Sequence, residues 1–187
     1  MPVKLGVRAD HSFDQPLGLL SDCHRRIENF LEMLIRVLDQ SNNGRAPLSD
    51  EQRRALEASL KYFAVAAPRH TQDEEQSLFP RMRASNDAQA SQAFERLDAL
   101  EHDHREADAA HAAVDRIGRQ WLDAAVLAPA QSQEIRELLH QLRDLYARHI
   151  EVEDKELFPL AARLLDEKQL QQVGSEMAER RGLNHPR

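Results

Sequence analysis

Two copies of a short pattern of histidine and glutamate stand out in this chain. The first is His70-Thr-Gln-Asp-Glu74 followed by Leu78-Phe79-Pro80, and the second is His149-Ile-Glu-Val-Glu153 followed by Leu157-Phe158-Pro159. The spacing is constant, since 149 − 70, 153 − 74 and 159 − 80 all equal 79. A histidine and a glutamate four residues apart lie on one face of a helix, so both side chains can point at one cation. The repeat therefore predicts metal binding by helical side chains.

Two further histidines extend the repeat. His24 and His104 each precede one copy and are 104 − 24 = 80 residues apart. Both lie on the apolar stripe of an amphipathic segment, where a buried polar group without a partner costs roughly 2 kcal/mol or more. A divalent cation would supply that partner, because neutral imidazoles and ionised carboxylates both donate lone pairs to it. The candidate ligands are His24, His70, Glu74, His104, His149 and Glu153.

The number and type of these donors favour two metal ions. Four imidazoles and two carboxylates are more than a single tetrahedral zinc requires, whereas two bridging carboxylates would let a pair of metals share them. The mixture of nitrogen and oxygen suits iron or manganese, and helix bundles with inward glutamates and histidines are known di-iron scaffolds. These donors therefore favour a pair of iron or manganese ions over zinc. Water, hydroxide or oxo would complete their coordination, and an open position would accept a small molecule such as dioxygen.

Three more polar residues lie close to the pattern. Glu28 and Asp108 come four residues after His24 and His104, and His111 comes seven residues after His104. The two acids could bind a metal directly, accept a hydrogen bond from a ligand, or lie at the surface. His111 could bind a metal, line an access path or pack in the core.

The other residues of the pattern have structural interpretations. Each Leu-Phe-Pro segment is predicted to pack in the core and then stop its helix, because proline disfavours helix at the residue before it. Glu75 is interpreted mainly as part of a solvated face, although a carboxylate next to a ligand could also assist metal entry. His102 is expected to face the solvent. Cys23 is interpreted as a packed thiol, since free cysteine is often buried.

Helices must position these residues. Glycine is rare, with six residues, and apolar residues recur in steps of three and four throughout the chain. This periodicity predicts an all-α fold, an antiparallel up-down-up-down four-helix bundle with a short C-terminal helix. The expected helices span about 16–40, 49–80, 91–125, 132–157 and 160–181.

Local signals refine these helices. Asp14 is the predicted N-cap of the first helix, and Ser49 with Gln52 forms a capping-box pattern at the start of the second. Pro68 predicts a kink or bulge two residues before His70. The second copy has Ala147 at that position, so the two halves are not expected to share one backbone.

Length and composition limit the class of protein. The 187 residues are expected to form one domain, with the bundle at about 15–160 and the C-terminal helix and tail at 161–187. The net charge is −7 and the basic residues form no stripe, which argues against nucleic acid and anionic membranes as partners. No apolar run reaches the ~20 residues that cross a bilayer.

The single cysteine excludes an intramolecular disulfide, which is typical of a reducing compartment. We therefore expect a soluble cytoplasmic protein.

Together these motifs resemble the hemerythrin-like family, the HHE cation-binding domain, over nearly the whole chain. The resemblance implies a bundle around a non-haem di-iron centre, with Glu74 and Glu153 as bridges. It also implies terminal ligation by the four repeated histidines, His24, His70, His104 and His149. The segments that carry the resemblance are 16–28, 70–80, 101–104 and 149–159.

One position departs from the family pattern. Oxygen-carrying hemerythrins place a second histidine four residues after the first on the third helix, but here position 108 is Asp. This difference argues against reversible oxygen carriage unless His111 takes the missing place.

Three classes of function are consistent with these residues. The leading hypothesis is a di-iron protein that binds, senses or handles dioxygen, peroxide or nitric oxide, with a small diatomic molecule as its partner. The alternative is an iron-dependent enzyme or iron donor, either peroxidase-like or active in the repair of iron–sulfur centres. A regulatory module that unfolds on iron loss is a third reading.

Overall fold

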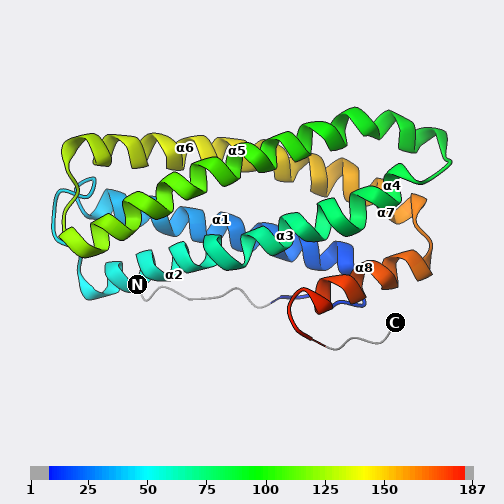
Figure 1. Ribbon diagram of the computed structural model, residues 1–187, viewed down its shortest axis with the longest axis horizontal. Helices are drawn as coiled ribbons and strands as arrows, with labels where there is room; N and C mark the ends of the chain where they lie inside the picture. Colours follow the sequence, from blue (N-terminus) through cyan, green and yellow to red (C-terminus); the bar gives the residue numbers. More distant parts are fainter. Residues whose placement is uncertain (1–8, 184–187) are drawn as a thin grey trace.

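The computed structural model describes residues 9–183, without the side chains of residues 88–92. Within this part of the chain, four helical stretches run alternately up and down and form a closed bundle (Figure 1). Each stretch packs on the next, and the fourth packs on the first. The predicted all-α architecture is thereby confirmed. The stretches are α1 (Pro16–Gln40); α2 (Asp50–Val65), α3 (Ala67–Asp73), η1 (Glu74–Leu78) and α4 (Phe79–Arg83); α5 (Ala88–Ala124); and α6 (Pro129–Val152), η2 (Glu153–Leu157) and α7 (Phe158–Leu164).

The predicted N-terminal cap is present in α2 but not in α1. The capping box of α2 is present, because Gln52 N–H donates to Ser49 Oγ at 3.2 Å and Ser49 N–H donates to Gln52 Oε1 at 2.8 Å. The predicted cap of α1 by Asp14 is wrong, since Gln15 is the N-cap residue and no side chain caps the helix. Pro16 in the first turn lacks the N–H that such a cap would bind there.

The second stretch is interrupted where the sequence predicted. Helix α2 ends at Val65, and α3 starts at Ala67 with Pro68 in its first turn. Because proline has no N–H and its ring crowds the preceding turn, the regular hydrogen-bond ladder cannot continue through it. Helix α6 runs unbroken through Ala147, so the two halves differ here as expected.

The Leu-Phe-Pro segments behave differently from the prediction. They pack in the core, with both phenylalanines 5% exposed or less, but they do not stop their helices. Phe79 N–H donates to Glu74 O, and Phe158 N–H donates to Glu153 O, so each segment lies at the end of a π-helical turn. This wider turn makes room for the proline ring, and the helices continue past it as α4 and α7. Each π-turn begins at one of the predicted glutamate ligands.

Two apolar clusters fill the bundle and leave a polar layer between them. One cluster contains Ile27, Ala67, Ala107 and Ile150, and it extends to the end of the bundle where Leu38, Leu56, Trp121 and Ile135 lie. The other contains the residues toward the opposite end, including Leu20, Leu78, Leu100 and Leu157. Five of the six predicted ligands fall between these positions along their stretches, and His149 comes one residue before Ile150. The donor atoms of all six nevertheless meet in this one layer. No helix within residues 9–183 is long and apolar enough to cross a membrane.

The C-terminal segment is divided rather than continuous. The expected helix at 160–181 begins instead as α7 and resumes as α8 (Glu167–Glu179), whose N-cap is Asp166. Helix α8 packs against α1, α3 and η1 on the outside of the bundle (Figure 1). Of the predicted tail, residues 184–187 lie outside the described residues.

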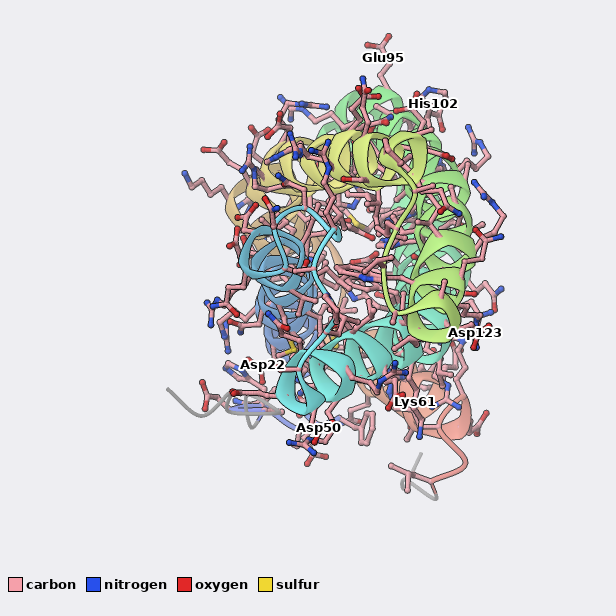
Figure 2. All side chains as sticks on the ribbon, turned by 90° about the vertical axis from the view of Figure 1, so that its left-hand side faces the viewer. Asp22, Asp50, Lys61, Glu95, His102 and Asp123 are labelled. Carbon is pink, nitrogen blue, oxygen red and sulfur yellow. The ribbon has the colours of Figure 1, made fainter. Side chains whose placement is uncertain are left out.

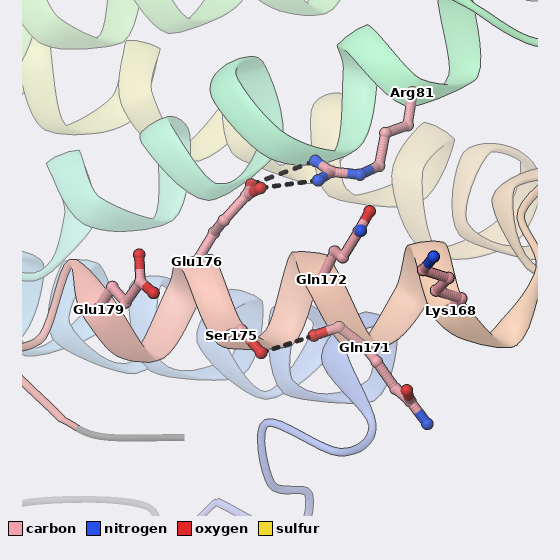
Figure 3. A pocket seen from close by; sticks show the side chains of 7 residues that line it. All are labelled: Arg81, Lys168, Gln171, Gln172, Ser175, Glu176 and Glu179. Carbon is pink, nitrogen blue, oxygen red and sulfur yellow. Dashed lines mark hydrogen bonds and ion pairs between the residues drawn. The ribbon is translucent and has the colours of Figure 1, made fainter. Parts of the chain in front are cut away.

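Ion pairs fix α8 to the second stretch. Arg180 Nη1 and Arg181 Nη2 donate to the two oxygens of the fully buried Asp73, at 2.9 and 2.7 Å. Within α8, about one turn before these arginines, Glu176 accepts two hydrogen bonds from Arg81 of α4 (Figure 3). Asp73 directly precedes Glu74, so α8 is joined to the helix that carries two of the predicted ligands.

Candidate metal centre

The polar layer contains two groups of potential metal-binding atoms. The first group is His24, His70, Glu74 and Glu153, and the second is His104, His149 and the same two glutamates. Within each group the donor atoms lie within 4.8 Å of one another, and all the residues are buried. The bundle thus brings all six predicted residues together, and both glutamates belong to both groups.

The first group joins α1 to the two π-turns. His24 Nε2 lies 3.0 Å from Glu153 Oε2 and 3.7 Å from Glu74 Oε1. His70 Nε2 lies 3.3 Å from Glu74 Oε1, one helical turn away. The His24 ring also stacks on Phe158 of the Leu-Phe-Pro segment, with 5.4 Å between ring centroids.

The second group joins α5 to the same π-turns. His104 Nε2 lies 3.4 Å from Glu74 Oε2, and His149 Nε2 lies 3.2 Å from Glu153 Oε2. The two imidazole nitrogens face each other at 3.1 Å. Lone pairs so close together need either a shared proton or a cation between them.

The hydrogen-bonding needs of this layer are not met by protein atoms. All four carboxylate oxygens of Glu74 and Glu153 are buried without a hydrogen-bond partner, and so is His24 Nε2. Buried charges of this kind persist in proteins when they are paired or bind metals. The donor set therefore fits cations that bind both carboxylates.

Three of the four histidines have a carboxylate at Nδ1, the ring nitrogen that faces away from the centre. Asp154 Oδ1 lies 3.0 Å from His24 Nδ1, and Glu75 Oε1 lies 2.8 Å from His104 Nδ1. These acids directly follow the two predicted glutamate ligands, and 154 − 75 = 79 keeps the offset of the repeat. Each carboxylate orients a histidine from another helix and fixes the tautomer in which Nε2 faces the centre.

Sequence reasoning missed these supporting acids. Glu75 was assigned to a solvated face, which is wrong, because it contacts His104 and its side chain is only 34% exposed. Asp154 was not singled out, although the acidic pairs Glu74-Glu75 and Glu153-Asp154 repeat with the motif. A search for repeated pairs rather than single ligands would have found both.

His149 also has a carboxylate at its Nδ1, but His70 does not. His149 Nδ1 lies 3.3 Å from Asp103 Oδ2, but His70 Nδ1 is buried without a hydrogen-bond partner. Asp103 precedes His104 as Cys23 precedes His24, so a buried thiol occupies the corresponding position in the first half. The two groups therefore differ in how their histidines are polarised.

The charged groups of the layer lower the pKa of Glu74 and raise the pKa of His104. Burial alone would raise the pKa of Glu74, but the neighbouring histidines hold it well below its usual range. Burial likewise opposes protonation of His104, yet Glu74 and Glu75 outweigh this effect and raise its pKa to about 10. Burial lowers the pKa of His70 to about 4, consistent with the missing acid at its Nδ1.

The three additional candidates lie outside both groups. Glu28 is exposed on α1, and Asp108 is exposed on α5. His111 Nε2 bonds to Tyr146 OH at 2.9 Å, and its ring stacks on Phe63. None of them belongs to the groups of donor atoms found among the described residues.

Comparison with known proteins agrees with this arrangement. The Hemerythrin HHE cation binding domain matches residues 15–161. The chain belongs to the hemerythrin HHE family. The match begins just before α1 and ends within α7, so it includes every residue of the polar layer. Membership of this family and the clustered histidines and glutamates identify a cation-binding protein.

A similar protein occurs in Haemophilus influenzae. This uncharacterized protein is 29% identical to the hemerythrin-family chain over 179 residues, which cover 91% of this chain and 92% of that protein. The similarity extends past the end of the family match at residue 161, so it includes chain beyond the bundle.

Proposed function

We propose that this chain is a non-haem di-iron protein that binds, senses or handles dioxygen, peroxide or nitric oxide. The observation that carries the proposal is that two groups of donor atoms share both Glu74 and Glu153. Two shared carboxylates match a pair of metals better than one ion, and six nitrogen and oxygen donors suit iron. The proposed ligands are His24, His70, Glu74, His104, His149 and Glu153.

The surroundings suit reactions with small molecules. Apolar clusters lie on both sides of the polar layer, and this low polarity strengthens electrostatic interactions within it. A pair of iron ions, when bound, would supply reversible one-electron chemistry at an open coordination position. The chain would hold the irons with its carboxylates, orient the histidines through Glu75, Asp103 and Asp154, and limit the access of water.

The absence of a histidine at position 108 bears on the type of function. Asp108 is exposed, and His111 is bonded to Tyr146 rather than placed within a ligand group. Neither residue supplies the additional imidazole of an oxygen-carrying hemerythrin. We therefore favour sensing or turnover of a small oxidant over reversible oxygen carriage.

The proposal is tested by metal analysis and anaerobic optical spectra of the purified protein. We expect two irons per chain and a spectral change on exposure of the reduced protein to dioxygen, peroxide or nitric oxide. Glu74→Gln and Glu153→Gln should each abolish stable binding of the pair, because each removes a shared ligand. Glu28→Gln, an exposed acid on α1, serves as the matched control. One metal per chain, or no response to any of the three molecules, would contradict the proposal.

An iron donor is the second candidate. The acids behind the histidines are partly exposed, with side-chain exposure of 34% for Glu75, 31% for Asp103 and 36% for Asp154. The proposed ligands are thus one side chain away from solvent, which favours exchange of metal. Transfer of iron to a metal-free iron–sulfur protein, measured by recovery of the acceptor's activity, distinguishes a donor from a sensor that retains its iron.

A further inference from the structure

A pocket opens beside the interruption between α2 and α3. Its volume is about 340 Å³, and it lies between that interruption and α5. Most of its wall is apolar, but three polar residues of α5 also line it, Asp108, His111 and Asp115. Pro68 lies two residues before His70, and Asp108 lies one turn after His104. The pocket is therefore adjacent to helices that carry proposed ligands of both groups.

His111 lines this pocket and also contacts the buried Tyr146. Its ring stacks on Phe63, with 4.2 Å between centroids and 21° between planes, and its Nε2 bonds to Tyr146 OH at 2.9 Å. Tyr146 is buried and lies on α6 three residues before His149, on the same face of that helix. A molecule that moves from the pocket toward the layer by this path has to pass the imidazole of His111.

The hydrogen bond to Tyr146 uses only one of the two ring nitrogens of His111. Burial lowers the pKa of His111 to about 4 and raises that of Tyr146, so both groups are neutral at physiological pH. If the phenol donates to Nε2, the imidazole proton is at Nδ1; if Nε2 donates, Nδ1 keeps a lone pair. In either case His111 Nδ1 is buried without a partner.

Asp115, one helical turn away from His111, also has a buried atom without a hydrogen-bond partner. Its Oδ2 accepts a hydrogen bond from Arg119 Nε at 2.7 Å, but its Oδ1 is buried without a partner. Residues four apart on a helix are neighbours, so His111 and Asp115 share one face of α5, and both line the pocket. A molecule that bridges them must donate to Asp115, and it can accept from His111.

We propose that this pocket binds a small neutral molecule that both donates and accepts hydrogen bonds, and that His111 admits it toward the metal layer. Among the oxidants of the proposed function, hydrogen peroxide has this chemistry, whereas dioxygen and nitric oxide have no hydrogen to donate. The carboxylates of Asp108 and Asp115 disfavour anions at the same place. The identification of peroxide rests on the proposed function, but the pocket and its hydrogen-bonding preference do not.

Binding is tested without redox chemistry in the zinc-loaded full-length protein. Imidazole ¹⁵N chemical shifts are followed by NMR during titration with hydrogen peroxide, with methanol as a protic probe and with acetonitrile as an acceptor that cannot donate. We expect saturable shifts at His111 with peroxide and methanol, and a much weaker response to acetonitrile. His102, exposed on the same helix (Figure 2), is the internal control and should not shift. No shift at His111, or an equal response to acetonitrile, would overturn the proposal.

Substitutions test the two polar partners. Asp115→Ala should raise the half-saturating concentration of methanol about tenfold, because a hydrogen bond to a charged group is lost. Asp123→Ala, an exposed acid on the same helix (Figure 2), should leave it unchanged. The His111→Gln variant keeps a polar side chain, so circular dichroism and retained zinc binding can establish that it is folded. Unchanged methanol affinity in Asp115→Ala would contradict the assignment.

Kinetics of the iron-loaded protein separate this inference from the proposed function. The rate constant for peroxide should fall at least severalfold in His111→Gln relative to that for nitric oxide. If peroxide reacts equally well in the variant, the pocket is not its route, although the di-iron function stands. If the zinc-loaded protein binds peroxide at His111 but the iron-loaded protein does not react with it, the peroxide function fails while the pocket stands.

Discussion

At the scale of single residues, the carboxylates behind the histidines distinguish this centre from a simple set of ligands. Glu75 and Asp154 each follow a proposed bridging glutamate and contact a histidine of a different helix. A carboxylate at Nδ1 makes the imidazole a more basic ligand and holds its ring in place. The unsupported His70 is the exception, so we expect the two metals to be inequivalent.

Replacing Glu75 by Gln should weaken metal binding by about 10-fold to 100-fold, because His104 loses the charge that polarises it. Asp154→Asn should have a similar effect through His24. Metal affinity can be measured by competition with a chelator of known strength. Glu28→Gln, at an exposed position on α1, should leave the affinity unchanged. Equal affinities in all three variants would show that these carboxylates do not support the histidines.

At the scale of helical elements, the π-turns and α8 shape the second and fourth stretches. Both π-turns begin at a glutamate of the centre and end before a Phe-Pro pair, so the motif determines backbone geometry as well as ligand type. Helix α8 adds a second constraint, because Arg180 and Arg181 both bind the buried Asp73 beside Glu74. The helix carrying two proposed ligands is thus held from its outer side.

Arg180→Gln combined with Arg181→Gln should lower the free energy of unfolding by about 3 kcal/mol, because a buried carboxylate loses its partners. Urea denaturation at neutral pH measures this change. The matched control is Arg83→Gln, which removes more exposed ion pairs with Asp98 and Glu101 and should cost less than about 1 kcal/mol. A similar small cost for both changes would indicate that α8 contributes little to stability.

At the scale of the whole molecule, the metal centre couples stability to pH. In the metal-free protein the pKa of His104 is raised to about 10, and the pKa values of His24 and His149 are also raised. A raised folded-state pKa stabilises the fold fully below the unfolded value of about 6.5, and this contribution is lost as pH rises toward 10. The metal-free protein should therefore become less stable between these pH values.

Metal should reverse this trend. Its ligands must be deprotonated to bind, so metal affinity increases with pH and the added stability increases with it. Thermal denaturation with and without chelator, at about pH 6 and about pH 9, should show a larger difference at the higher pH. A difference that shrinks as pH rises would contradict binding of metal by these histidines.

The sequence by itself determined which segments are helical and which residues are candidate metal ligands. Both follow from local rules, because apolar residues at steps of three and four define the buried face of each helix, and the repeat places a histidine on each face. The break at Pro68 and the capping box at Ser49 were predictable for the same reason. Each depends on a few neighbouring residues.

Only the tertiary structure decided how the helices align. The heights of His24, His70, His104 and His149 depend on how four helices pack lengthwise, and the two apolar clusters set that register. The contacts of Glu75 with His104, the π-turns in place of helix stops, and the division of the C-terminal helix also depend on packing between distant segments. Local periodicity cannot specify these features, because each arises from the balance of contacts between residues far apart in the chain.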